Sequence, residues 1–218
     1  ASAAPWWWAF FSKGDGGSLS SSSSVERYIS QFISSAASQD TVYLASFTWG
    51  TGTNDPVNGS SWGINALYNV RSGAGAPIRV IADGDDLADI NATKLSQIPM
   101  VSSPQSGSAT HNKLAVVGTQ AVMTGSMNFT SGGYSNQPNN MVIVRVPAVV
   151  RAYQTEMDDQ FLNSNFVENS PSPQNLFTSP NGDRIEVFFA PDDNGNISLS
   201  PYSAGSALKE VIQYHISN

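Results

Sequence analysis

The sequence predicts an α/β fold in which a mixed β-sheet is flanked by helices on both faces. Three observations lead to this prediction. Apolar strand-like runs alternate with amphipathic helical runs along most of the 218 residues. The apolar share of 40% is enough for a sizeable core. A strand, turn and helix pattern near the N-terminus recurs near the C-terminus, which indicates an internal repeat.

The elements follow in a βαβ rhythm. The first helix is predicted at residues 25–34, where apolar residues recur at the i, i+3, i+4, i+7 and i+8 positions of one helical face. Pro147 marks the start of the last helix before the second half of the repeat pattern. The predicted strands are 41–47, 78–84, 113–118, 121–126 and 140–146, and the further predicted helices are 62–73, 87–97 and 147–163.

The two ends of the chain resemble each other. The run WWWAFFSKGDGG precedes the first helix, and the similar run IEVFFAPDDNGN precedes a helical run at residues 208–217. We therefore predict a first repeat at residues 1–167, a linker rich in Pro, Ser and Asn at 168–182, and the start of a second repeat at 183–218. Since a sheet cut off at this point would keep an open edge, we expect the rest of the second repeat on another polypeptide.

Composition narrows the classes of function. The net charge of −7 argues against a broad basic face for duplex DNA. The chain has no cysteine and no apolar run long enough to cross a membrane, so we expect no disulfides and no stable membrane insertion. Four Asn-x-Ser/Thr sequons favour a secreted or lysosomal glycoprotein. These sequons begin at Asn58, Asn91, Asn128 and Asn196.

The stretch THNKLAVVGTQAVMTGSMNFTSGGY carries the candidate chemistry. His111 and Lys113 are two residues apart, so on a strand both side chains point to the same side. The apolar run after them is expected to turn back at residues 118–120, which brings Ser126 and Asn128 to the same sheet edge. An imidazole, an ammonium, a hydroxyl and a carboxamide can together surround a phosphate group. A His-x-Lys pair alone is a weak signal, and the Gly-Ser-x-Asn run after it makes the prediction specific.

The run from His111 to Thr130 resembles the HKD motif of the phospholipase D superfamily, which is His-x-Lys, an apolar run and then Gly-Ser-x-Asn. The resemblance extends over most of residues 6–165, and the run GSMNFT is similar to the nuclease-like members. It implies a reaction without metal or cofactor, in which one histidine forms a phosphohistidine and the histidine of a second motif acts as general acid and base. The second motif comes from a second repeat or a second subunit.

Carried over by this resemblance, His111 is the nucleophile or the general acid, and Lys113, Ser126 and Asn128 hold the phosphate. Asn128 also heads a sequon, and since an asparagine that binds phosphate cannot carry a glycan, we expect glycans only at the other three sequons.

The sequence departs from the family pattern at two positions. Gly118 stands where the aspartate of the motif is expected, and Asn139 stands where an acidic residue orients the histidine. A carboxylate makes a paired imidazole a stronger base than an amide does. This half-site is therefore weakened, uses another carboxylate such as Glu156, or supports a stronger half-site.

Three functions remain open. The resemblance favours a secreted phosphodiesterase that acts on nucleic acid. The first alternative is a phospholipase D that acts on phosphatidyl lipids. The second is a degenerate member that binds phosphate groups without turnover. The acidic run DGDDLAD lacks the spacing of a calcium loop, so it is predicted to be a turn with solvated carboxylates rather than a metal site.

Overall fold

The computed structural model describes residues 5–12, 24–50, 67–87, 98–104, 110–130, 132–133, 137–166 and 174–190, together with residues 197, 201, 209, 212, 213 and 215. The chain divides into two compact units, Ala1–Ser164 and Asn165–Asn218. The boundary between the units lies close to residue 167, where the first repeat is predicted to end.

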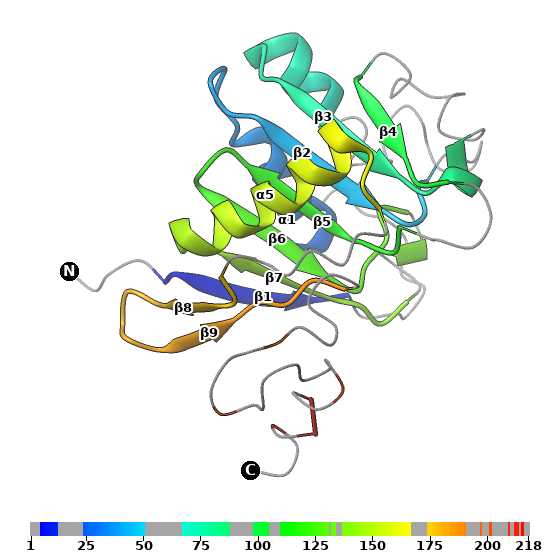
Figure 1. Ribbon diagram of the computed structural model, residues 1–218. Helices are drawn as coiled ribbons and strands as arrows, with labels where there is room; N and C mark the ends of the chain where they lie inside the picture. The colour runs from blue at the N-terminus through cyan, green and yellow to red at the C-terminus, as the bar shows by residue number, and fades with distance from the viewer. Residues whose placement is uncertain are drawn as a thin grey trace. The chain divides into compact units, whose positions relative to one another are not determined.

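A seven-stranded mixed sheet is the centre of the described part of the first unit (Figure 1). The strands are β1 (Trp7–Phe11), β2 (Val42–Ser46), β3 (Ile78–Ala82), β4 (Met100–Ser102), β5 (Leu114–Val117), β6 (Ala121–Gly125) and β7 (Asn140–Val144). Their order across the sheet is β1-β7-β6-β5-β2-β3-β4. Strands β2, β3 and β4 are parallel, and the other neighbouring pairs are antiparallel. The predicted mixed sheet is confirmed, whereas strand β4 was not predicted.

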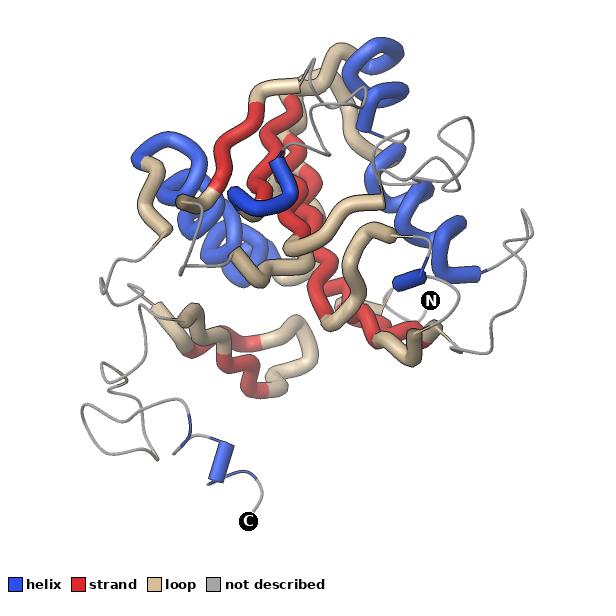
Figure 2. The backbone as a smooth tube through the Cα atoms, turned by 90° about the vertical axis from the view of Figure 1, so that its right-hand side faces the viewer, coloured by secondary structure: helices blue, strands red, loops and turns tan. Residues whose placement is uncertain are grey.

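Helices cover both faces of this sheet (Figure 2). Helix α5 (Pro147–Asn163) lies in front of the sheet in Figure 1 and α1 (Ser24–Ser34) lies behind it. Successive residues of β2 point to opposite faces. Leu44 joins the apolar cluster that includes α1, while the hydroxyl of Tyr43 hydrogen-bonds Asp158 of α5. Both helices begin and end within a residue of their predicted bounds.

Two further helical segments bear on the predictions. Residues 67–69 are helical and lead into a short π-helix, η1 (Val70–Ala74). These residues overlap the helix predicted at 62–73 and end one residue beyond it. A 3-10 turn, η2 (Gly84–Asp86), follows β3. Most of the helix predicted at 87–97 lies outside the described residues.

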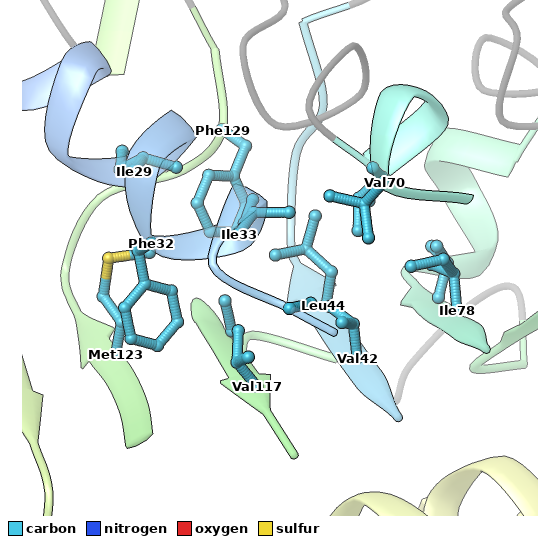
Figure 3. Packing of buried hydrophobic residues seen from close by; sticks show 14 of the residues in the cluster. Ile29, Phe32, Ile33, Val42, Leu44, Val70, Ile78, Val117, Met123 and Phe129 are labelled. Atoms are coloured by element: carbon cyan, nitrogen blue, oxygen red, sulfur yellow. The ribbon is translucent and has the colours of Figure 1, made fainter. Parts of the chain in front are cut away.

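The main core lies between α1 and the sheet, as Figure 3 shows. Ile29 and Ile33 of α1 are fully buried against Leu44 and its neighbours on the strands. Burying one such side chain contributes about 1.5–3 kcal/mol. Phe129, which is 1% exposed, belongs to the same cluster and ties the segment after β6 to the core.

The second unit contains a two-stranded antiparallel sheet of β8 (Leu176–Thr178) and β9 (Arg184–Glu186). Strand β8 lies within the segment predicted as a linker, and β9 lies near the start of the strand predicted in the second repeat. The described residues of the predicted terminal helix are helical. These residues are Lys209, Ile212, Gln213 and His215. Assignment of this unit to a second repeat stays a prediction.

Two further predictions concern glycosylation and membrane insertion. The proposed glycosylation sites Asn58, Asn91 and Asn196 all lie outside the described residues. Among the helices of the described part, none combines the length and the apolar character needed to span a bilayer.

Candidate active site

The predicted site residues meet at one end of the large sheet. Lys113 directly precedes β5, Ser126 directly follows β6, and Asn139 directly precedes β7. Since these three strands are antiparallel neighbours, their ends come together at one edge. The backbone N–H of Gly125 donates to the Lys113 carbonyl at 3.2 Å, and that of Ser126 donates to the Asn140 carbonyl at 3.0 Å.

His111 is exposed at this edge and rests on two side chains. The Lys113 Nζ lies 3.2 Å from Nδ1 and 3.4 Å from Nε2 of the imidazole, and it donates to the His111 carbonyl at 2.9 Å. The Phe47 ring lies 4.7 Å from the imidazole between centroids, and the Lys113 ammonium lies 5.3 Å from the centre of the same Phe47 ring. Lys113 and Phe47 thus hold the imidazole in place while it faces solvent.

Lys113 is an unusual cation because it is only 7% exposed. Burial lowers the pKa of its ammonium below the usual value for lysine, since burial disfavours the charged form. Its location follows from the chain, because Lys113 leads directly into the buried strand β5. Contact with the Phe47 ring compensates part of the lost hydration. Phe47 was not predicted as a site residue, because an aromatic residue at the end of a buried strand is indistinguishable from core in the sequence.

Gly125 allows β6 and β7 to approach closely beside the site. A Cβ atom at this position would lie 2.1 Å from the carbonyl oxygen of Asn140. A larger residue would therefore separate the two strands and shift Ser126. The glycine of the Gly-Ser-x-Asn run has a packing role.

Ser126 and Asn139 contact each other. The Ser126 hydroxyl donates to Asn139 Oδ1 at 3.0 Å and accepts from the Asn140 N–H at 3.0 Å. The Asn139 amide donates to the carbonyl of Gly133 at 3.0 Å. Asn139, which stands where the family has an acidic residue, thus holds the loop around Ser126.

Asn128 is half-buried between two residues that anchor it. Met127 and Phe129 are both buried in the core, so Asn128 points away from the core. Its Oδ1 accepts from the backbone N–H of Thr48 at 3.3 Å. This bond fixes the orientation of the carboxamide and leaves its Nδ2 without a hydrogen bond to the described residues. The Nδ2 group is therefore available as a donor to a phosphate oxygen.

Gly118 lies at the other end of β5, in the turn to β6. Its φ of +46° is in the left-handed region, and a Cβ atom there would lie 2.2 Å from Asp40 Oδ1. The Asp40 carboxylate accepts from the Ala37 N–H at 2.8 Å and from the Gln120 side chain at 2.7 Å. At the position where the motif aspartate is expected, this chain therefore has room only for glycine, and Asp40 supplies a carboxylate to the same turn.

Glu156 lies on α5 and is linked to the chain beside His111. It accepts from the Gln160 amide at 2.7 Å, and Gln160 in turn accepts from the Asn112 amide at 3.3 Å. Asn112 is the residue between His111 and Lys113. That Glu156 serves as the substitute carboxylate stays a prediction. Two hydrogen bonds, through Gln160, connect Glu156 to Asn112, the residue next to His111.

The acidic turn after β3 differs from its prediction. Asp83 is buried, being 4% exposed, and it accepts several hydrogen bonds, so the expectation of a solvated carboxylate was wrong for this residue. Asp85 on the same turn is exposed. Within the described part of the chain, no three His, Asp or Glu side chains lie close enough together to hold a metal ion.

Comparison with known proteins identifies the family. The sequence profile of the family described as cardiolipin synthase, PLD-like domain, matches residues 29–161, which is more than half of the chain. The chain therefore belongs to the phospholipase D superfamily. The matched segment contains His111, Lys113, Ser126 and Asn128.

One sequence relative and two solved structures illustrate this relationship. A mitochondrial cardiolipin hydrolase of Xenopus laevis is 33% identical over 85 residues, which are 37% of this chain and only 40% of that protein. Nuc of Salmonella typhimurium, a phospholipase D family member, superposes with a TM-score of 0.53 at 20% identity, over 72% of this chain and 93% of Nuc. NucT of Helicobacter pylori gives 0.51 at 14% identity, over 72% of this chain and 97% of NucT. The two structural matches confirm the fold, and the family match supports the class of phosphodiesterases.

Proposed function

We propose that this chain carries one half-site of a phosphodiesterase that uses His111 as a nucleophile and acts on nucleic acid. The observation that carries the proposal is the arrangement around His111. An exposed imidazole rests on a buried lysine and an aromatic ring. At the same sheet edge lies Asn128, whose Nδ2 donates no hydrogen bond to the described residues. This arrangement presents a nucleophile and hydrogen-bond donors to one phosphate group.

In the proposed reaction, a ring nitrogen of His111 attacks phosphorus and the bond from phosphorus to the leaving oxygen breaks. The leaving oxygen takes a proton from the histidine of a second HKD motif. That histidine then removes a proton from water, the water oxygen attacks phosphorus, and the bond between phosphorus and nitrogen breaks. Lys113 and Asn128 donate hydrogen bonds to the non-bridging oxygens. Ser126, which the sequence predicted to hold the phosphate with them, keeps the loop in position instead, because its hydroxyl already donates to Asn139. The chemistry requires neither metal nor cofactor.

The second histidine is proposed to come from an HKD motif outside these 218 residues, in a second repeat or in another subunit. The other histidine of this chain, His215, is followed by Ile216 and Ser217, so the sequence around it lacks the His-x-Lys pattern. In its own unit His215 is exposed and lies 3.5 Å from Glu186.

Two observations bear on the substrate. The run GSMNFT, which is similar to the nuclease-like members of the superfamily, supports a nucleic acid substrate. The sequence relative from Xenopus laevis is named a cardiolipin hydrolase, which supports the lipid alternative. A secreted or lysosomal location, with glycans at Asn58, Asn91 and Asn196 and none at Asn128, completes the proposal.

The test is a cleavage assay in excess EDTA across acidic to neutral pH, with a single-stranded oligonucleotide in one arm and cardiolipin vesicles in the other. We expect cleavage of the oligonucleotide, its loss by more than about 10³-fold in His111→Asn, and no loss in the matched control His215→Asn. Reactions quenched with denaturant at alkaline pH, where a phosphorus–nitrogen bond is stable, should contain a phosphate adduct on the peptide that holds His111. Cleavage of the lipid alone would establish the first alternative, and no cleavage of either substrate by material that also contains the second HKD motif would favour the non-catalytic member.

A further inference from the structure

We propose that Asp83 is a positioning residue that holds the backbone immediately before His111. Asp83 is 4% exposed and directly follows β3. Oδ2 accepts from the backbone N–H of Thr110 at 2.9 Å and from the Ser103 hydroxyl at 3.2 Å, and Oδ1 accepts from the Asp85 N–H at 3.1 Å. His111 is thus one residue away from a buried carboxyl group that accepts hydrogen bonds from three donors.

The same turn also holds the segment that orients Asn128. Asp86 Oδ2 accepts from the backbone N–H of Trp49 at 2.8 Å. The preceding residue, Thr48, donates its N–H to Asn128 Oδ1, and Trp49 pairs with Phe129 in a parallel bridge. The three-residue turn η2 therefore connects to both sides of the site.

Ser103 in turn fixes the position of the Asp83 carboxylate. Besides donating to Asp83, its hydroxyl accepts from the backbone N–H of Gly84 at 3.2 Å. Ser103 directly follows β4, so the carboxylate is held between the ends of two parallel strands. Through its hydrogen bonds to Ser103 and Thr110, the Asp83 side chain fixes Thr110 relative to the ends of β3 and β4.

This arrangement matters because His111 itself precedes β5 and lies outside the regular strand pairing. Residues 105–109 carry no structural description, so the Thr110 bond to Asp83 is the attachment nearest to His111 on its N-terminal side within the described residues. A displacement of about 1 Å at a nucleophile can cost about 10²-fold in rate. We infer that Asp83 and Asp86 together set the spacing between the attacking nitrogen and the amide that holds the phosphate.

The inference rests on the proposed function of His111, and its test separates the two. The variant is Asp83→Asn, whose single carbonyl oxygen cannot accept from Thr110 and Asp85 together. One of these backbone N–H groups then faces the amide nitrogen, a second donor, so the attachment of Thr110 is weakened or lost. Asp85→Asn is the matched control, because it removes the same charge from the same turn at an exposed carboxylate. Ser103→Ala is the second control, because it weakens the attachment of the same carboxylate but leaves the bond to Thr110.

In the activity arm, kcat of Asp83→Asn should fall about 10- to 100-fold, with KM within about twofold of wild type. Asp85→Asn should keep both values, and Ser103→Ala should lose less kcat than Asp83→Asn at equal folded fraction. Equal losses in Asp83→Asn and Ser103→Ala would overturn the inference, because general loosening of the turn would then explain both.

The second arm needs no turnover. The chain has two histidines, so histidine-selective isotope labelling gives two sets of ring signals, and His111→Asn identifies those of His111. Asp83→Asn should shift or broaden the His111 signals and leave those of His215 unchanged, whereas Asp85→Asn should alter neither. If wild type is inactive on every substrate but the His111 signals respond to Asp83→Asn, the proposed function fails and the positioning stands. If the His111 signals ignore Asp83→Asn, the positioning is refuted.

Discussion

Replacing Gly118 by alanine tests whether Asp40 occupies the space that a side chain at position 118, where the family motif has its aspartate, would need. Gly118 has a φ of +46°, and a Cβ atom there would lie 2.2 Å from Asp40 Oδ1. Two costs therefore add. An L-residue in the left-handed region costs about 1–2 kcal/mol, and forcing Asp40 aside adds about 1–3 kcal/mol. We expect Gly118→Ala to lower the free energy of unfolding by about 2–5 kcal/mol.

Gly75 provides a matched control. Its φ of +72° is also positive, but no atom lies within 4 Å of the place a Cβ would take. Gly75→Ala should therefore show only the backbone cost of about 1–2 kcal/mol. The difference between the two alanine variants measures the contact with Asp40.

Urea unfolding followed by the fluorescence of the five tryptophans is the assay. In the Asp40→Ala background the carboxylate is gone and only the Cβ at 3.1 Å remains. The cost of Gly118→Ala should therefore shrink by about 1–3 kcal/mol, which a double-mutant cycle reports as coupling energy. If Gly118→Ala costs no more than Gly75→Ala, or if the coupling is absent, Asp40 does not occupy this position and the reasoning is refuted.

Three further predictions follow from the described contacts. Burial lowers the pKa of Lys113, so the charged ammonium destabilises the folded state. Lys113→Met should therefore be at least as stable as wild type near neutral pH, while activity falls about 10²-fold or more. The stability advantage of Lys113→Met over wild type should shrink as pH rises toward the usual pKa of lysine, where the wild-type side chain loses its charge. Burial, aided by Asp158, raises the pKa of Tyr43 to about 12. The folded state therefore keeps the Tyr43 proton to a higher pH than the unfolded state does. The stability that results is complete below about pH 10 and is lost as pH rises toward 12. In Tyr43→Phe the free energy of unfolding should fall less over this range than in wild type. Asn139→Asp should lower stability by about 1–2 kcal/mol in thermal unfolding without raising kcat, because a carboxylate would face the Gly133 carbonyl in place of a donor.

The sequence predicted the regular elements well, because periodic patterns and local signals report them directly. Helix α5 begins at Pro147 and ends at Asn163 as predicted, and the turn between β5 and β6 lies where glycine indicated it. Strand β4 escaped prediction because Met100–Ser102 is too short to show an alternating pattern.

Contacts between distant segments were beyond prediction. The burial of Asp83 depends on Ser103 and Thr110, and the support of His111 by Phe47 depends on the pairing of β2 with β5. In the sequence, an aspartate after a strand is equally compatible with a solvated turn. Only the fold distinguishes the two environments.

The structure also separates features that adjoin in the motif. Gly118 and Asn139 both motivated the non-catalytic alternative, yet Gly118 lies at the opposite end of β5 from His111, where Asp40 supplies a carboxylate. We therefore expect the glycine at this position to affect the β5–β6 turn and the stability of the fold rather than the chemistry at His111. Asn139 does lie at the site end, but its two polar groups are bonded to Ser126 and Gly133, so it supports the loop. With Gly118 removed from the argument, the case against catalysis depends on Asn139 alone, and the assay that decides it is the rate of Asn139→Asp beside wild type.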